Sequence, residues 1–182
     1  GIKVTVKVNG HDVYVKAMYL APEVFQTVPM FFLTTDLPEN DYLARTIVER
    51  LYHPNDEARI AQNIILGIGG AKVVEALGGS DVYHLNEGHG LPAFYYLRDQ
   101  GVKKEQFAFT THTPEKAGNE ERDGRHLNRC GFFGKTLSEE ELEKEKQKAL
   151  NRSKILNFAG ARKIIANQLG SQSLINDAIN YL

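Results

Sequence analysis

The stretch VYHLNEGHGLPAFYYLRDQGVKKEQFAFTTHT, residues 82–113, decides the fold class of this chain. Residues 82–85 and 107–111 are short apolar and aromatic runs of strand length, and residues 90–100 between them have a helical pattern. A strand, a helix and a second strand within this length form a right-handed crossover between parallel strands. The stretch therefore predicts a βαβ unit and an α/β fold.

A β-hairpin is predicted before this unit. Residues 2–8, IKVTVKV, alternate between apolar and polar side chains, and Asn9 and Gly10 suit the positive φ angles of a tight turn. The return strand is expected at 13–20. The apolar run MFFL at 30–33 is too short for a helix, so it predicts a buried strand.

Two helices are expected between the hairpin and the βαβ unit. The first spans 41–52 with Asn40 or Asp41 as its cap, and the second spans 55–77. The second helix contains three glycines, which are Gly67, Gly69 and Gly70. Glycine destabilises a helix interior, so these positions predict either a break or the close approach of another backbone. A phosphate-binding loop fits less well, because no strand precedes the glycines and no Gly-Lys-Ser/Thr follows them.

The part after the βαβ unit is more polar. Residues 114–135 are predicted to form an exposed loop that includes Cys130. Arg129 beside it could lower the thiol pKa, but no catalytic signature surrounds Cys130, so a free structural thiol is favoured. Ser138 and Glu141 form a capping box before a charged, solvated helix. Two further helices are expected at 156–182.

Composition limits the function classes. The 182 residues suit one domain, and 22 basic against 23 acidic residues give no footprint for nucleic acid. No apolar run approaches the roughly 20 residues that span a bilayer, so no membrane segment is expected. The single cysteine excludes an internal disulfide framework and favours a reducing compartment, so the cytoplasm is expected.

Polar side chains follow both predicted strands of the βαβ unit. Asn86, Glu87 and His89 follow the first strand, and His112 follows the second. Ligands bind beyond the carboxyl ends of parallel strands, and amide, carboxylate and imidazole groups suit sugar hydroxyls. The same side chains could instead satisfy loop backbone and cap the helix that starts near residue 90.

A metal-dependent hydrolase is an alternative interpretation of the same region. Its ligands would be His84, Glu87, His89 and His112. His84 and His89 are five residues apart, which is not the spacing of a zinc-binding helix, so no metal is expected.

Four ordered motifs resemble the α-glucan phosphorylases, the family of glycogen, starch and maltodextrin phosphorylases. They are TDLPEN (35–40), RLYHPNDEARIAQNIILGIGGAKVV (50–74), VYHLNEGHG (82–90) and FTTHTPEKAG (109–118). The resemblance implies part of the N-terminal lobe of a GT-B glycosyltransferase, with a Rossmann-like parallel sheet. It divides the chain into a hairpin and strand at 1–35, a motif-bearing α/β core at 36–118, and a loop with helices at 119–182.

The family's activity implies a function for these residues. Phosphorylases use inorganic phosphate to release α-glucose 1-phosphate from an α-1,4-glucan, with pyridoxal phosphate as cofactor. By this resemblance His112 is the catalytic histidine, which binds a glucose hydroxyl and offers its carbonyl to the reacting carbon. Asn86, Glu87, His89 and Thr113 would line the same glucose site. The implied partners are the glucan, phosphate, the remaining phosphorylase lobes and a second copy in a homo-oligomer.

The sequence also departs from the family pattern. The glycine-rich segment Gly-Asn-Gly-Gly-Leu-Gly and the lysine motif for pyridoxal phosphate are absent, and residues 115–120 replace the usual continuation after the His112 motif. We therefore expect a phosphorylase fragment that is inactive alone. A noncatalytic glucan-binding or assembly module derived from a phosphorylase lobe is the alternative.

Overall fold

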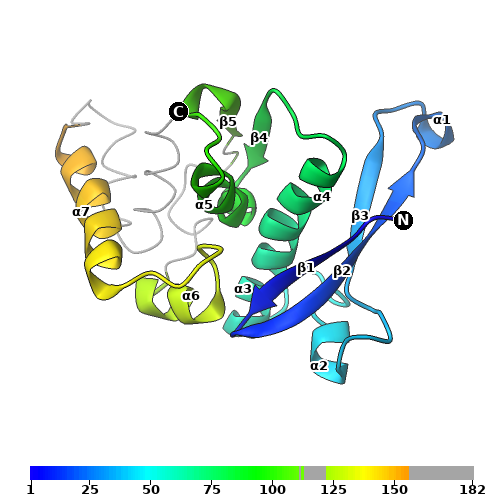
Figure 1. The fold of residues 1–182 in the computed structure, drawn as a ribbon, viewed down its shortest axis with the longest axis horizontal. Coiled ribbons are helices and arrows are strands. Elements are labelled where there is room, and N and C mark those ends of the chain that lie inside the picture. The colour runs from blue at the N-terminus through cyan, green and yellow to red at the C-terminus, as the bar shows by residue number, and fades with distance from the viewer. Residues whose placement is uncertain (111, 113–121, 156–182) are drawn as a thin grey trace.

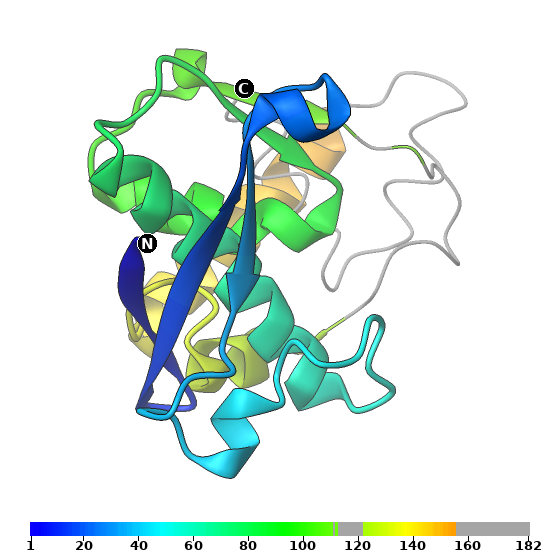
Figure 2. The same ribbon diagram turned by 90° about the vertical axis from the view of Figure 1, so that its right-hand side faces the viewer.

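The structure, a computed structural model, describes residues 1–110, 112 and 122–155. It is a mixed α/β arrangement with a three-stranded antiparallel sheet and a two-stranded parallel sheet (Figure 1). A long helical segment packs against the antiparallel sheet on one side and against the crossover helix of the parallel unit on the other. Figure 2 shows the antiparallel sheet in front of this helical layer.

The antiparallel sheet has the order β1-β2-β3, with bounds Lys3–Val8, His11–Leu20 and Met30–Thr34. Asn9 and Gly10 have φ angles of 50° and 80°, so the predicted hairpin turn is confirmed. Strand β3 is present as predicted, but its predicted burial is wrong. It is an edge strand in which Phe31 and Phe32 are 37% and 52% exposed, and Leu33 packs against the core.

Apolar side chains gather at the far end of this sheet. Beyond Ala17 the β2 strand and the short helix α1, Pro22–Phe25, are no longer covered by the helical layer. The large apolar side chains exposed there are Met18, Tyr19, Val24, Phe25, Val28, Phe31 and Phe32. Several large exposed apolar side chains in one region are typical of a surface that another protein covers.

The predicted helix at 41–52 is wrong beyond its first turn. Helix α2 spans only Tyr42–Arg45, and turns follow it. Asp41 caps it, since its Oδ1 accepts a hydrogen bond from the Ala44 amide at 2.8 Å. Leu43 and Leu51 are 75% and 81% exposed. Most helical stability in proteins comes from packing an apolar face. Here only Ile47 and Val48 of the apolar pattern pack against the core, while Leu43 and Leu51 stay exposed.

The predicted helix at 55–77 is confirmed, with a π-helical turn in its middle. It consists of α3 at Asp56–Ile64, the π-turn η1 at Ile65–Gly69 and α4 at Gly70–Ala76. A Cβ atom on Gly67 would lie 2.8 Å from the Ala93 backbone nitrogen and 2.9 Å from the Pro92 Cβ. The close approach of another backbone, expected from the glycines, is thus found at Gly67.

The βαβ unit is confirmed within one or two residues at each boundary. Strands β4, Tyr83–Asn86, and β5, Phe107–Thr110, are parallel, and α5 at Leu91–Asp99 connects them. Two 3₁₀ turns flank the helix, η2 at Gly88–Gly90 and η3 at Lys104–Gln106. Phe94 and Tyr95 of α5 are buried and pack edge-on against the rings of Phe107 and Phe133, respectively.

Part of the predicted loop at 114–135 is a helix, α6 at Gly124–Cys130. Asp123 caps it, since its Oδ1 accepts from the His126 amide at 2.9 Å, and Gly131 ends it at a φ of 94°. Cys130 is therefore on a helix and buried, not in a loop. The N-cap residue Asp123 and the terminating Gly131 are both present in the sequence, but the many charged residues around them favoured a loop.

Helix α7, Glu139–Ile155, begins with the predicted capping box. The Ser138 amide donates to Glu141 Oε2 at 2.7 Å, and the Glu141 amide donates to Ser138 Oγ at 3.2 Å. The helices expected at 156–182 lie outside the described residues. Among the helices that the structure does describe, none is both long and apolar enough to cross a membrane.

Candidate functional site

The candidate site lies where β4 and β5 end side by side. The last residues of the two strands, Asn86 and Thr110, are partners in the parallel register. The Glu87 amide donates to the Thr110 carbonyl at 2.8 Å, which extends the pairing one residue beyond β4. Polar residues that follow either strand are therefore brought to one edge of the sheet, as predicted from the βαβ pattern.

Asn86 and Glu87 hold His112 at two points. The Glu87 carboxylate accepts a hydrogen bond from the His112 backbone amide, and His112 Nε2 lies 2.9 Å from Asn86 Oδ1. Glu87 thus orients the backbone of His112, and Asn86 orients its ring. The structure brings these three predicted site residues together from segments 25 residues apart.

The Asn86 contact selects one tautomer of His112. An amide oxygen can only accept, so Nε2 carries the proton and donates it to Asn86 Oδ1. In the neutral ring Nδ1 is then an acceptor, which can receive a hydrogen bond from a hydroxyl group. The His112 residue is exposed, so a ligand can reach it.

The backbone of Glu87 is strained. Its φ of 59° and ψ of −177° lie in a region that favours glycine. This conformation turns the chain sharply from β4 into η2, while the Glu87 side chain reaches back to the His112 amide. Strain of this kind persists where the surrounding contacts hold it, and it is concentrated at functional sites. No sequence signal indicated it.

The other predicted site residues have different surroundings. His84 Nε2 lies 2.6 Å from Thr110 Oγ1, so this ring binds across the strand pair. His89 is half-buried, and its ring lies 6.4 Å from the ring of Tyr52. Thr113 lies outside the described residues. Thr110 and Tyr52 were not predicted from the sequence; Tyr52 meets the site only through the tertiary fold.

A cavity of about 370 Å³ adjoins the strand ends. It lies between α4, β4 and α5, and apolar residues form most of its wall, with His84 and Asn86 as its main polar groups. A concave surface with few polar groups is the common form of a small-molecule site. Among the described residues, no lysine contributes to this wall.

The arrangement does not favour the alternative of a metal centre. His84 and His89 turn to Thr110 and Tyr52, away from a common point with His112. Within residues 1–110, 112 and 122–155, no three His, Cys, Asp or Glu side chains are grouped closely enough to hold a metal ion.

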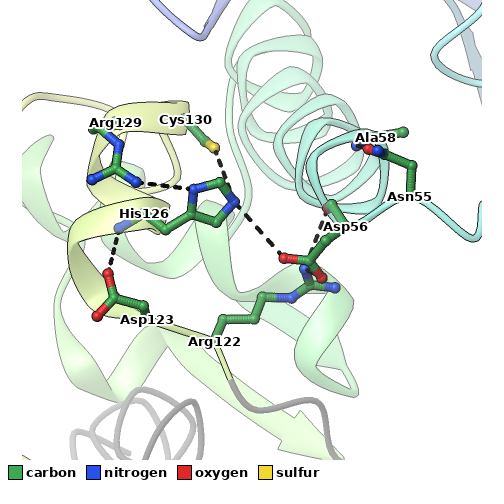
Figure 3. Close-up of polar contacts among 8 residues, drawn as sticks. All are labelled: Asn55, Asp56, Ala58, Arg122, Asp123, His126, Arg129 and Cys130. Carbon is green, nitrogen blue, oxygen red and sulfur yellow. Dashed lines mark hydrogen bonds and ion pairs between the residues drawn. The ribbon is translucent and has the colours of Figure 1, made fainter.

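A separate Cys–His–Asp grouping joins α6 to the start of α3 (Figure 3). His126 Nε2 lies 4.0 Å from Cys130 Sγ and 3.8 Å from Asp56 Oδ2. A nucleophile-activating histidine uses different ring nitrogens for the nucleophile and the carboxylate, and here one nitrogen faces both. Burial raises the pKa of the Cys130 thiol, and the side chain is 2% exposed. The possibility that Arg129 yields a low thiol pKa is therefore wrong, because desolvation outweighs its charge.

This grouping has a structural role. The buried Arg122 guanidinium forms an ion pair with Asp56, which lies 66 residues away in the sequence. Together with His126, this contact ties the segment that enters α6 to the first turn of α3 (Figure 3). Cys130 packs behind it as a small apolar side chain.

Comparison with known proteins gives relatives for part of the chain. An uncharacterized protein of Methanocaldococcus jannaschii is 46% identical over 136 residues, which cover 73% of this chain and 26% of that protein. The glycogen phosphorylase of Mycobacterium tuberculosis is 38% identical over 110 residues, or 50% of this chain and 13% of the enzyme. The maltodextrin phosphorylase of Thermococcus litoralis is 39% identical over 108 residues, which cover 51% of this chain and 13% of that protein.

No protein-family model and no solved structure matches the chain. The chain spans about a quarter of the length of the Methanocaldococcus relative and about an eighth of each phosphorylase. About half of the chain is therefore similar in sequence to glycogen and maltodextrin phosphorylases, as the four motifs predict.

Proposed function

We propose that this chain is part of an α-glucan phosphorylase and forms one wall of its glucose site. The observation that carries the proposal is the pair of hydrogen bonds that hold His112 beside Asn86 and Glu87 at the strand ends. The sequence similarity to phosphorylases over half the chain supports it independently. In this proposal the chain belongs to the N-terminal lobe of a GT-B glycosyltransferase.

The proposed reaction is the attack of inorganic phosphate on the terminal α-1,4-linked glucose of a glucan, which yields α-glucose 1-phosphate. His112 is the catalytic residue of this chain. Its ring accepts a hydrogen bond from a glucose hydroxyl, and its backbone carbonyl stabilises the positive charge that develops at the reacting carbon. Glu87 and Asn86 position the backbone and ring of His112. His89 and Thr113 complete the sugar-binding wall in this proposal.

Pyridoxal phosphate would belong to another part of such an enzyme. A lysine must hold this cofactor, and no described lysine lines the cavity beside β4. The wall of this cavity therefore does not fit the cofactor. The lone cysteine, buried and reduced, is consistent with a cytoplasmic enzyme.

The remaining lobes, and a second copy in a homo-oligomer, are the proposed protein partners. The exposed apolar side chains of β2, α1 and β3 support this, because such a surface is stabilised when a neighbour covers it. A monodisperse monomer of the 182-residue chain in light scattering would contradict self-association through this surface.

The experiment that tests the function compares the 182-residue chain with the complete polypeptide that carries this sequence. We would measure release of glucose 1-phosphate from maltodextrin and phosphate, with pyridoxal phosphate added. Activity is expected in the complete polypeptide and not in the 182-residue chain. In the complete polypeptide, His112→Ala should lower kcat at least about 100-fold, as expected for loss of a group that stabilises transition-state charge.

A matched control separates the catalytic role from folding. His84→Ala removes an exposed imidazole of the same sheet end and should reduce kcat far less than His112→Ala, because His84 binds Thr110 and not the His112 pair. An inactive complete polypeptide that still binds maltoheptaose would refute the phosphorylase proposal in favour of the binding module. Equal effects of the two substitutions would refute the role of His112.

A further inference from the structure

A second cavity, of about 460 Å³, lies between the β1–β2 hairpin, α4, α5 and the segment that follows α6. It shares no lining residue with the cavity beside β4. Its wall combines the apolar side chain of Ile68 and the ring of Tyr96 with hydroxyl and amide groups from Thr5, Asn128 and Thr136. Its volume is within the range that small-molecule sites occupy.

Two contacts fix the wall of this cavity. The Asn9 amide in the hairpin turn donates to the Cys130 carbonyl at the end of α6, at 3.0 Å. Gly131 has a φ of 94°, and a Cβ atom there would lie 2.8 Å from the Lys7 carbonyl oxygen. Only glycine permits this approach, so the hairpin and the end of α6 are held together as the two sides of one cavity.

The wall has more basic than acidic residues. Its basic residues are Lys7, Lys72, Arg129 and Lys135, and Asp12 is its one acidic residue. These four cations come from four separate segments, so their convergence is a property of the fold and not of one basic run. A concave wall with more basic than acidic residues attracts anions, because it focuses the positive potential.

Two of the cations lack a carboxylate partner among the described residues. The Lys72 ammonium donates to the Thr5 carbonyl at 2.8 Å and lies 5.6 Å from the centre of the Tyr96 ring. The Arg129 guanidinium makes one weak contact, 3.4 Å from His126 Nδ1.

The other two cations have replaceable partners. Lys7 pairs with Asp12 and Lys135 pairs with Asp99, each at 2.7 Å. The Lys7 side chain is 68% exposed and the Lys135 side chain 49%. Exposed ion pairs contribute little stability, so these ammonium groups can turn to a ligand at small cost.

We propose that this cavity binds the phosphate group of a small anion, either free phosphate or a phosphorylated metabolite. Arg129 and Lys135 contact the phosphate oxygens at the mouth, Lys72 supplies charge from the floor, and the Tyr96 ring packs against the rest of the ligand. Guanidinium groups suit phosphate because their planar N–H donors match its oxygens. The site is separate from the proposed glucose site and does not depend on the proposed function.

Calorimetric titration of the 182-residue chain tests the proposal, with inorganic phosphate, glycerol 3-phosphate and glycerol as probes at constant ionic strength. Both phosphates should bind and glycerol should not. Tighter binding of glycerol 3-phosphate would assign the cavity to a phosphorylated metabolite, and equal or weaker binding would assign it to free phosphate. Arg129→Gln and Lys135→Gln should each weaken binding about tenfold, as expected for loss of one charged hydrogen-bond donor.

Two control variants locate the binding. Lys104→Gln removes the same charge from an exposed position outside the cavity and should leave the affinity unchanged. His112→Ala should also leave it unchanged, because that residue is in the other site. No binding of either phosphate to the wild type overturns the proposal. So does an affinity that Arg129→Gln and Lys135→Gln leave intact, or one that His112→Ala abolishes.

Discussion

The packing of η1 against α5 and the meeting of β4 with β5 use opposite kinds of contact. At the first, Gly67 lets the Ala93 backbone approach closely, and buried apolar side chains surround the contact. At the second, Asn86, Glu87 and His112 form polar contacts at an exposed edge, and Glu87 has a strained backbone. The first region depends on shape and burial, which stabilise the fold. The second retains exposed donors and acceptors, which suit a ligand.

This contrast predicts where substitutions change the free energy of unfolding. In the packed region an added methyl group has no space, because neighbouring backbone cannot move away cheaply. At the strand ends a substitution changes contacts that water can replace, so its effect on unfolding is small and its effect on ligand binding is large.

The largest effect is expected for Gly67→Ala. Its Cβ would overlap the Ala93 nitrogen and the Pro92 ring, so we expect a loss of about 2–3 kcal/mol of unfolding free energy, as for overpacked cores. Gly70→Ala is the matched control in the same helix. Its nearest contact is Leu33 Cδ1 at 4.0 Å, so alanine should be neutral or stabilise by up to about 1 kcal/mol. Urea denaturation measures both, and equal effects would refute the close approach at Gly67.

Asn40→Ala should cost about 2 kcal/mol. The pairing of β3 with β2 ends at Lys16 and Thr34. Beyond that point the buried Asn40 side chain makes the hydrogen bonds to the β2 backbone that a neighbouring strand would make. Its Oδ1 accepts from the Tyr14 amide at 2.9 Å, while its Nδ2 donates to the carbonyls of Tyr14 at 2.8 Å and Thr35 at 2.7 Å. Alanine leaves these backbone groups without their partner.

Asp41→Ala is the comparison variant for Asn40→Ala. It removes only an exposed helix cap and should cost about 1 kcal/mol. Thermal or urea unfolding of both variants would show the difference. A larger loss for Asp41→Ala would mean that the cap, and not the strand-like pairing of Asn40, stabilises this region.

Glu87→Gly should change the unfolding free energy by less than about 1 kcal/mol, because glycine relieves the strain at a φ of 59° while the bond to the His112 amide is lost. The His112 ring should become less ordered, which NMR relaxation of its side chain can measure. A loss above about 2 kcal/mol would show that Glu87 belongs to the packed framework instead of the site.

The smallest effect is expected for Glu141→Gln and depends on pH. Hydrogen bonds from Ser138 hold the pKa of the Glu141 carboxyl below its usual value of 4.5. A carboxyl whose pKa is lower in the folded state stabilises the fold above its unfolded pKa and loses this contribution as pH falls through the folded pKa. The wild type should therefore be slightly more stable than the variant at pH 7 and equal to it at low pH. A constant difference across pH in thermal melts would contradict this.

Local sequence signals predicted the elements whose stabilising contacts are near in sequence. Asn9-Gly10 predicted the hairpin, the Ser138 and Glu141 box predicted the start of α7, and the apolar runs around 82–111 predicted the βαβ unit. The same signals were misleading at residues 41–52, where only part of the helically spaced apolar residues packs against the core and Leu43 and Leu51 stay exposed. They also failed at α6, where the many charged residues favoured a loop although the segment is a capped helix.

By itself, the sequence determined the α/β class, the parallel unit and the gathering of Asn86, Glu87 and His112 at one sheet edge, because strand direction and spacing dictate all three. Only the tertiary structure decided the strained Glu87, the approach of the His89 ring to the Tyr52 ring, the link from Asp56 to Arg122 and the basic cavity. Each of these depends on segments far apart in the chain. Their contacts arise from packing, which local propensity and periodicity do not encode.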